Sequence, residues 1–207
     1  MSPQTFADDL AYIRDLAEAG QKAPLLAGRF LAWWGGLAAL AYVGHYLISS
    51  GALGLPLYYV SWMWGVFFVL GFGGFKFMQL TFPPAKPGAG SAGNRVSALV
   101  WMGAGFMLFA FFAGVIAKSF LDGSASIGFL WSVPVVLGAY GLSQLTSGLI
   151  AQSRPLIVAG WVAIASVFAA VLLVGREEIW LLGAAVAFST VFVPGMILMR
   201  EEPSETV

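Results

Sequence analysis

The chain has no cysteine among its 207 residues. It therefore cannot form a disulfide, present a thiolate nucleophile, or bind zinc or an iron–sulfur cluster through thiolates. Histidine is nearly absent as well, because His45 is the only one. A single histidine could supply one axial ligand to a tetrapyrrole but not a second. We predict no metal site and no cofactor, with a tetrapyrrole held by His45 alone as the alternative.

Charged residues are scarce, and acidic residues are missing from long stretches. Only 10% of the residues are charged and the net charge is zero, whereas soluble domains carry roughly 25%. A neutral chain offers no electrostatic basis for binding nucleic acid. No Asp or Glu occurs between Glu18 and Asp122, or between Asp122 and Glu177. Because an acid–base pair cannot be assembled there, we predict that the protein is not an enzyme.

Apolar residues make up 59% of the chain and gather in six long blocks. Crossing a bilayer core of about 30 Å takes roughly 20 apolar residues of helix. The sequence therefore predicts an all-α, polytopic membrane protein with a six-helix transmembrane bundle over residues 25–200. A cytoplasmic amphipathic helix over 1–24 precedes the bundle, and an acidic cytoplasmic tail over 201–207 follows it. The blocks cover residues 30–49, 55–76, 96–117, 127–149, 155–175 and 178–199.

The basic residues predict how the six blocks are threaded. Lys and Arg are enriched in cytoplasmic loops of membrane proteins. With a cytoplasmic N-terminus, only Lys118 and Arg176 fall on the outer side. We therefore predict a multi-pass protein of the cell (inner) membrane with both termini in the cytoplasm. Eight basic residues fall on the inner side: Arg14, Lys22, Arg29, Lys76, Lys86, Arg95, Arg154 and Arg200.

The eight tryptophans all fall in the first half of their blocks, most of them near its start, where indole rings can anchor a helix at the headgroup level. Each odd-numbered block begins with an arginine followed by a tryptophan, and each even-numbered block begins with another tryptophan. Two interpretations are open. The chain is three copies of a helical hairpin, or a single bundle in which positive-inside bias and aromatic belts give the same pattern.

Two prolines interrupt the apolar blocks. Pro134 lies in the fourth block and Pro194 in the sixth. Proline has no backbone N–H and clashes with the preceding turn of a helix. We therefore expect each of them to kink its helix.

A few polar residues recur inside the fourth and sixth blocks. Tyr140, Gln144 and Ser147 follow helical spacing in the fourth block, and Ser189 and Thr190 lie near the middle of the sixth. Hydroxyl and amide groups of this kind often tie helices together. Alternatively, these residues line a cavity for a neutral or amphipathic ligand.

His45 lies about 8 Å past the midpoint of the first block, at 1.5 Å of rise per residue. This position is near the outer boundary, beside Tyr46 and close to Tyr58 and Tyr59 of the next block. We expect a histidine that is hydrogen-bonded within a polar, partly wet cluster. The tetrapyrrole ligand and a pH-sensing role are the alternatives.

Residues 5–19 form an amphipathic segment. Phe6, Leu10, Ile13 and Ala17 share one helical face, and acidic side chains occupy the other. An acidic face would be repelled by anionic lipid. The apolar face is therefore expected to dock on protein, either the chain's own cytoplasmic loops or a partner.

Together these features predict a non-catalytic integral membrane protein that serves as an accessory, assembly or regulatory subunit of a larger membrane complex. Its expected partners are membrane lipid and other membrane protein subunits or a second copy, but not nucleic acid. The alternative is a small uncoupled transporter, channel or membrane sensor for a neutral or amphipathic ligand. The candidate ligand-binding residues are Tyr140, Gln144, Ser147, Ser189, Thr190 and His45.

Overall fold

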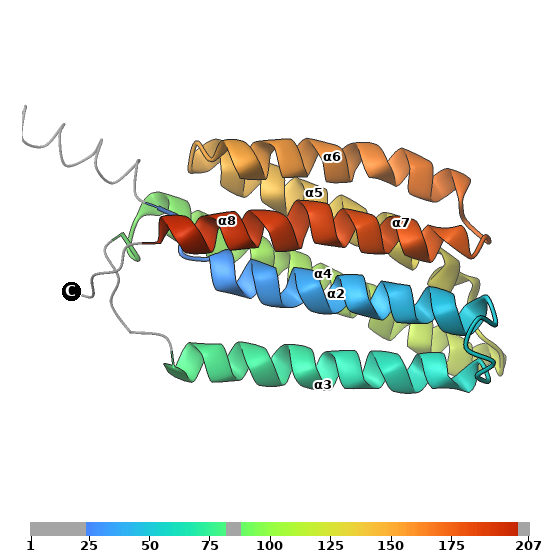
Figure 1. Ribbon diagram of the computed structural model, residues 1–207. Coiled ribbons are helices and arrows are strands. Elements are labelled where there is room, and N and C mark those ends of the chain that lie inside the picture. Colours follow the sequence, from blue (N-terminus) through green and yellow to red (C-terminus); the bar gives the residue numbers. More distant parts are fainter. Residues whose placement is uncertain (1–23, 82–87, 203–207) are drawn as a thin grey trace, which may run out of the picture.

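The computed structural model describes residues 24–81 and 88–202, and these residues form helices without any strand. The all-α prediction is therefore confirmed for this part of the chain. Successive spans run antiparallel, so that α2, α4 and α6 begin at the same end of the bundle (Figure 1). The elements are α2 Gly28–Ser49, α3 Tyr58–Thr81, α4 Ala92–Asp122, η1 Ile127–Trp131, α5 Ser132–Ile150, α6 Arg154–Leu172, α7 Glu178–Val186, η2 Ala187–Phe192 and α8 Val193–Glu201.

Six spans in this arrangement are long and apolar enough to cross a membrane, in agreement with the six predicted blocks. η1 with α5 forms the fourth span, and α7, η2 and α8 together form the sixth. The predicted amphipathic helix, with Phe6, Leu10, Ile13 and Ala17, lies outside the described residues, as does residue range 203–207 of the predicted tail.

The third span is longer than the block that predicted it. α4 has 31 residues, which corresponds to a length of about 46 Å. Ser91 caps its N-terminus, because the Ser91 hydroxyl accepts a hydrogen bond from the Asn94 backbone N–H at 3.2 Å. Gly123 ends it in the left-handed conformation, with φ of 64°.

The spans fall into a packed core and two outlying helices. α5 packs extensively on α6, and α2 packs along α7, η2 and α8. In contrast, α3 makes its principal contacts with α2 alone, and α4 with α5 and η1. Figure 1 shows α3 on the far side of α2 from α6. We call α2 and α5–α8 the core, and α3 and α4 the outlying helices.

Glycine allows the core backbones to touch. A Cβ added at Gly35 would lie 2.5 Å from the Phe192 nitrogen, and one added at Gly160 would lie 2.6 Å from the Leu145 nitrogen. Because no side chain fits at these distances, the α2–η2 and α5–α6 contacts both require glycine.

The two prolines, each predicted to kink its helix, both lie in a first turn that follows an irregular element. Pro134 is in the first turn of α5, directly after the 3₁₀-helix η1, so it begins a helix instead of bending one. A first-turn position tolerates proline because its N–H would have no partner within the helix. Pro194 is in the first turn of α8 and follows η2, which is a π-helix. The sixth span is therefore interrupted, and its interruption precedes the proline.

The packing does not divide the molecule into three equal hairpins. The most extensive contact, between α5 and α6, joins the second predicted hairpin to the third. The first span also packs along the whole of the last one. A duplication in the sequence stays a prediction, but the folded unit is organised around pairs of helices from different hairpins.

Candidate functional site

Three polar side chains are almost fully buried along α5, and one of them, Gln144, contacts the buried Thr190 of the interrupted sixth span. Ser143, Gln144 and Ser147 come from α5, and Thr190 comes from η2; none is more than 2% exposed. We call these four residues the polar cluster. Burying polar groups away from water costs free energy unless they are hydrogen-bonded. The hydrogen bonds of these four side chains therefore show whether the cluster only joins helices or has free polar atoms for a ligand.

Gln144 is bonded to the backbone of the neighbouring span. Its Nε2 donates to the carbonyl oxygen of Thr190. In an α-helix this carbonyl would accept from the residue four positions later, which is Pro194 and has no N–H. The Gln144 amide thus supplies a donor that the proline cannot, as neighbouring helices often do for interrupted membrane helices.

Two further atoms of the cluster are buried without a hydrogen-bond partner among the described residues, namely Gln144 Oε1 and Ser147 Oγ. They lie on the same helical face, three residues apart on α5. Each can bond a small polar group, since the amide oxygen accepts and the hydroxyl both donates and accepts. The Thr190 hydroxyl is already engaged, donating to the Val186 carbonyl at 2.7 Å.

The structure brings together three of the predicted ligand-binding residues and separates the others. Gln144, Ser147 and Thr190 belong to the polar cluster. Tyr140 is half-buried one turn along α5, where its ring lies 6.0 Å from that of Trp101. Ser189 is exposed and donates to the Ala185 carbonyl of its own helix at 2.7 Å, so it does not join the cluster.

His45 lies in a separate cluster of aromatic rings, which differs from the predicted surroundings. Its Nδ1 accepts a hydrogen bond from Trp64 Nε1 at 3.1 Å. Its ring stacks on Trp180, with centroids 3.5 Å apart and planes at 18°. Tyr42 packs against both tryptophans, at 5.5 Å and 6.1 Å. We call Tyr42, His45, Trp64 and Trp180 the histidine cluster.

The predicted tyrosine neighbours of His45 pack elsewhere. Tyr58 and Tyr59 stack on each other, with centroids 4.6 Å apart. The loop between α2 and α3 places the start of α3 beyond His45, so that Trp64, more than a turn further along, lies opposite the histidine. The position of His45 along its helix could be counted from the sequence, but its partners could not.

Asn94 connects three segments through hydrogen bonds of its side chain, a role that the sequence analysis did not predict. Its Oδ1 accepts from the Leu26 N–H at 2.8 Å, and its Nδ2 donates to the carbonyls of Pro24 and Gly88 at 2.9 Å and 3.0 Å. It thereby joins the segment before α2 to the first turn of α4. The Ser91 and Asn94 spacing, typical of a helix start, is the local signal that could have indicated it.

An ion pair joins the first span to the last. Arg29 Nη2 lies 3.0 Å from Glu202 Oε2, and the Glu202 side chain is only 3% exposed. At the other end, the Ser49 hydroxyl donates to a carboxylate oxygen of Glu177, directly before α7. α2 is thus bonded to the sixth span at both ends.

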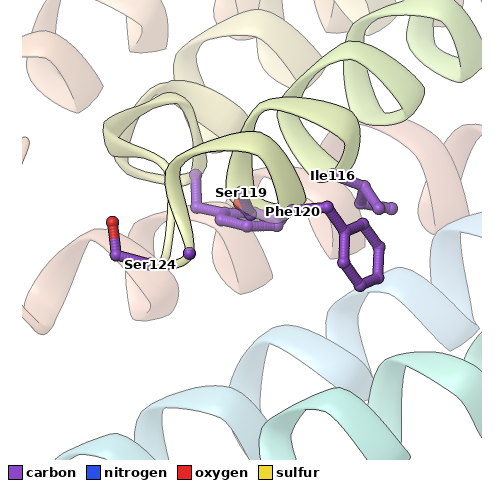
Figure 2. Close-up of a pocket in the computed structure, with 6 residues that line it drawn as sticks. Ile116, Ser119, Phe120 and Ser124 are labelled. Carbon is purple, nitrogen blue, oxygen red and sulfur yellow. The ribbon is translucent and has the colours of Figure 1, made fainter.

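Two surface pockets lie away from both clusters. One, of about 440 Å³, is formed by the end of α4 and the following turn; Figure 2 shows Ile116 and Phe120 side by side on it and Ser124 apart from them. The other, of about 280 Å³, lies where α5 turns into α6, beside Pro24 and Arg154. Neither is lined by the polar cluster or by His45. In the part of the chain that the structure describes, no three His, Asp or Glu side chains gather to hold a metal.

Comparison with protein families, with curated proteins and with solved structures finds no match to this chain.

Proposed function

We propose that this chain is an integral protein of the cell (inner) membrane, with six transmembrane helices and both termini in the cytoplasm. The proposal is supported by six apolar spans and by the distribution of basic residues. Near the predicted outer side, Lys118 lies 2.8 Å from Asp122, and Arg176 lies 3.2 Å from Glu178. Both outer cations are thus paired with acidic neighbours, while the orientation itself follows from the unequal numbers of Lys and Arg on the two sides.

We further propose that the protein is a non-catalytic accessory or assembly subunit that binds another membrane protein through the outlying helices. The observation that carries this proposal is how little of them the chain itself covers. Only 6% of the apolar stretch of α3 is buried, and likewise of α4, against 56% for the span Ile127–Ile150. Two full-length helices therefore offer most of their surface to lipid or to a partner.

The glycines of the outlying helices favour a protein partner over lipid alone. A Cβ added at Gly65 or Gly73 of α3, or at Gly103 or Gly114 of α4, would meet no atom within 4 Å. Glycine in a helix is unfavourable by roughly 0.5–1 kcal/mol relative to alanine, and in membranes it commonly permits close helix contact. The core uses its glycines in this way. Open glycines on α3 and α4 are suited to a further helix, from another subunit or a second copy.

The interior chemistry supports a non-catalytic role. The acid-free spans bury only neutral polar groups at the polar cluster, and Gln144 there is bonded to a backbone carbonyl. No acid–base pair is available at that position to transfer a proton.

Purification of the full chain from its own membranes in mild detergent, followed by native mass spectrometry, tests the accessory function. We expect other chains, or a second copy, to co-migrate in a fixed ratio. Gly103→Leu and Gly114→Leu should lower that ratio, because they add bulk to an open face of α4. Ala165→Leu, which adds bulk to an exposed position of α6, is the matched control. A stable monomer without companions, or equal losses in all three variants, would contradict the proposal.

The transporter or sensor alternative depends on Gln144 Oε1 and Ser147 Oγ, the two buried atoms without a described partner. If it holds, Ser147→Ala should change the flux or affinity of a neutral solute in proteoliposomes. Unaltered flux of neutral solutes, together with fixed-ratio companions, would decide for the accessory function.

A further inference from the structure

We propose that His45 is a pH-sensitive joint, which holds α3 against the core while it is neutral and releases Trp64 when it is protonated. This inference goes beyond the proposed function and does not depend on which partner the outlying helices bind. Two tryptophans contact the imidazole ring, Trp64 through a hydrogen bond at its edge and Trp180 by stacking on its face.

Trp64 requires a neutral histidine. Its indole N–H can only donate, and it donates to His45 Nδ1 at 3.1 Å. The neutral ring must therefore carry its proton on Nε2. Protonation would place a second proton on Nδ1, so that two N–H groups would face each other. The hydrogen bond cannot survive that change without a movement of Trp64 or His45.

Trp180 favours the opposite charge state. It presents its ring face to His45, with centroids 3.5 Å apart and planes at 18°. The face of an indole ring attracts a cation, because the π-system is negative there. Protonation therefore strengthens the contact of His45 with α7 and abolishes its bond with α3. Protonation thus shifts the attachment of His45 from α3 to α7.

The bond to Trp64 matters because few hydrogen bonds join α3 to the core in the part of the chain that the structure describes. The principal contacts of α3 are with α2, and the indole N–H of Trp33 makes a second hydrogen bond to it, donating to the Gly71 carbonyl at 3.3 Å. That bond is in the other half of α3 and has an acceptor that does not titrate. Loss of the Trp64 bond would leave that half of α3 held by ring contacts, such as those of Trp34 with Phe67 and of Tyr42 with Trp64, while the other half keeps its hydrogen bond.

The charged and titratable groups at the His45 end of the elements packed against this residue come from α2, α3 and the residues at the start of α7. Glu177 already accepts from Ser49, and Arg176 is paired with Glu178. A Glu177→Gln variant serves as the control for the carboxylates. The groups are Tyr42, Tyr46, Tyr58, Tyr59, Arg176, Glu177 and Glu178.

The absence of cysteine makes the proposal directly measurable. Cysteines introduced at Val66 of α3 and Leu172 of α6, both exposed, can carry spin labels in the full chain reconstituted in lipid nanodiscs. Double electron–electron resonance then reports the separation of the two helices between about pH 8 and about pH 3, a range that extends more than about three units below the ordinary histidine pKa of about 6.5. We expect a narrow distance distribution at the higher pH that broadens or shifts in acid.

Three variants make the result specific. His45→Gln retains an acceptor that does not titrate, so its distribution should stay narrow throughout. Trp64→Phe removes the donor, so its distribution should be broad at every pH. Trp33→Phe removes the non-titrating bond, and it should keep the pH response, as should Glu177→Gln.

The outcomes are distinct. A wild-type distribution that does not change with pH would overturn the proposal, and so would a full pH response in His45→Gln. If His45→Gln fails to fold, Trp64→Phe decides, because a pH response that persists in it cannot involve the Trp64 bond.

Discussion

The core and the outlying helices use the same residue type for different ends. Gly35 and Gly160 lie where two backbones meet, and any side chain there would collide with a neighbouring main chain. Gly103 and Gly114 also lie within apolar helical stretches, but a Cβ added at either of them would meet no atom within 4 Å. In a membrane, lipid is as apolar as leucine, so apolar character does not draw a helix inward. Close-fitting glycine contacts therefore define the core better than hydrophobicity does.

Replacing a packed core glycine and an open glycine of an outlying helix by leucine should have the largest and most different effects on stability. Gly160→Leu should destabilise the protein by about 3 kcal/mol or prevent folding, since a Cβ alone would lie 2.6 Å from the Leu145 nitrogen. Gly103→Leu should leave stability unchanged or raise it by up to about 1 kcal/mol, because the site is open and glycine is the less favourable helix residue. Reversible unfolding in mixed micelles measures both. Similar losses at the two positions would remove the distinction between core and outlying helices.

The Gln144 bond sharpens the comparison within the core. Gln144→Leu should cost about 2 kcal/mol, because it leaves a buried carbonyl without its donor. Pro194→Ala restores a backbone N–H, so it should recover part of that loss when combined with Gln144→Leu. The double-mutant cycle measures this coupling, and additive effects would show that Gln144 does not substitute for the missing N–H. Ser189→Ala on the exposed face is the control.

Asn94 tests how an outlying helix is held. Asn94→Ala removes bonds to Pro24, Leu26 and Gly88 and should cost about 1–2 kcal/mol. The effect should be local, with faster amide hydrogen exchange at Leu26 and in the first turn of α4 but not in α6. Uniformly faster exchange would mean that α4 is part of the cooperative core.

The smallest expected effect is a gain of stability at the α5–α6 turn. Gln152 has φ of 52°, a left-handed conformation that glycine adopts without strain. The turn is closed by the Ser153 N–H donating to the Gly148 carbonyl at 2.8 Å. Gln152→Gly should therefore stabilise the protein by about 0.5–1 kcal/mol, measured by the same unfolding assay, while Gln152→Val should destabilise it.

The six spans could be predicted from sequence because apolar length is a local property. The partners of each span could not, since they depend on contacts between distant segments. The tryptophan pattern predicted where Trp64 and Trp180 lie along their helices, but not that both turn toward His45. Helical spacing brought Gln144 and Ser147 together correctly, whereas Ser189 lies one residue from Thr190 and faces outward.

The interruption of the sixth span was only half visible in the sequence. Pro194 predicted an irregularity, but the π-helix η2 begins seven residues before it. A π-helical turn is wider than an α-helical one, so neighbouring helices must leave room for it and supply hydrogen bonds. Here Gly35 of α2 leaves the room, and Gln144 of α5 supplies a hydrogen bond. Such a requirement cannot be read from the segment itself.

The length of α4 has a consequence for the shape of the protein at the proposed outer surface. At about 46 Å it exceeds a hydrocarbon layer of about 30 Å by several turns. Its contacts with α5 limit how far it can lean to hide the excess. In the proposed orientation, the final turns of α4 extend past the hydrocarbon layer, with Phe120 and Leu121 83% and 87% exposed beside the Lys118–Asp122 ion pair. They would then form a small apolar patch at the level of the lipid headgroups, accessible to molecules outside the cell.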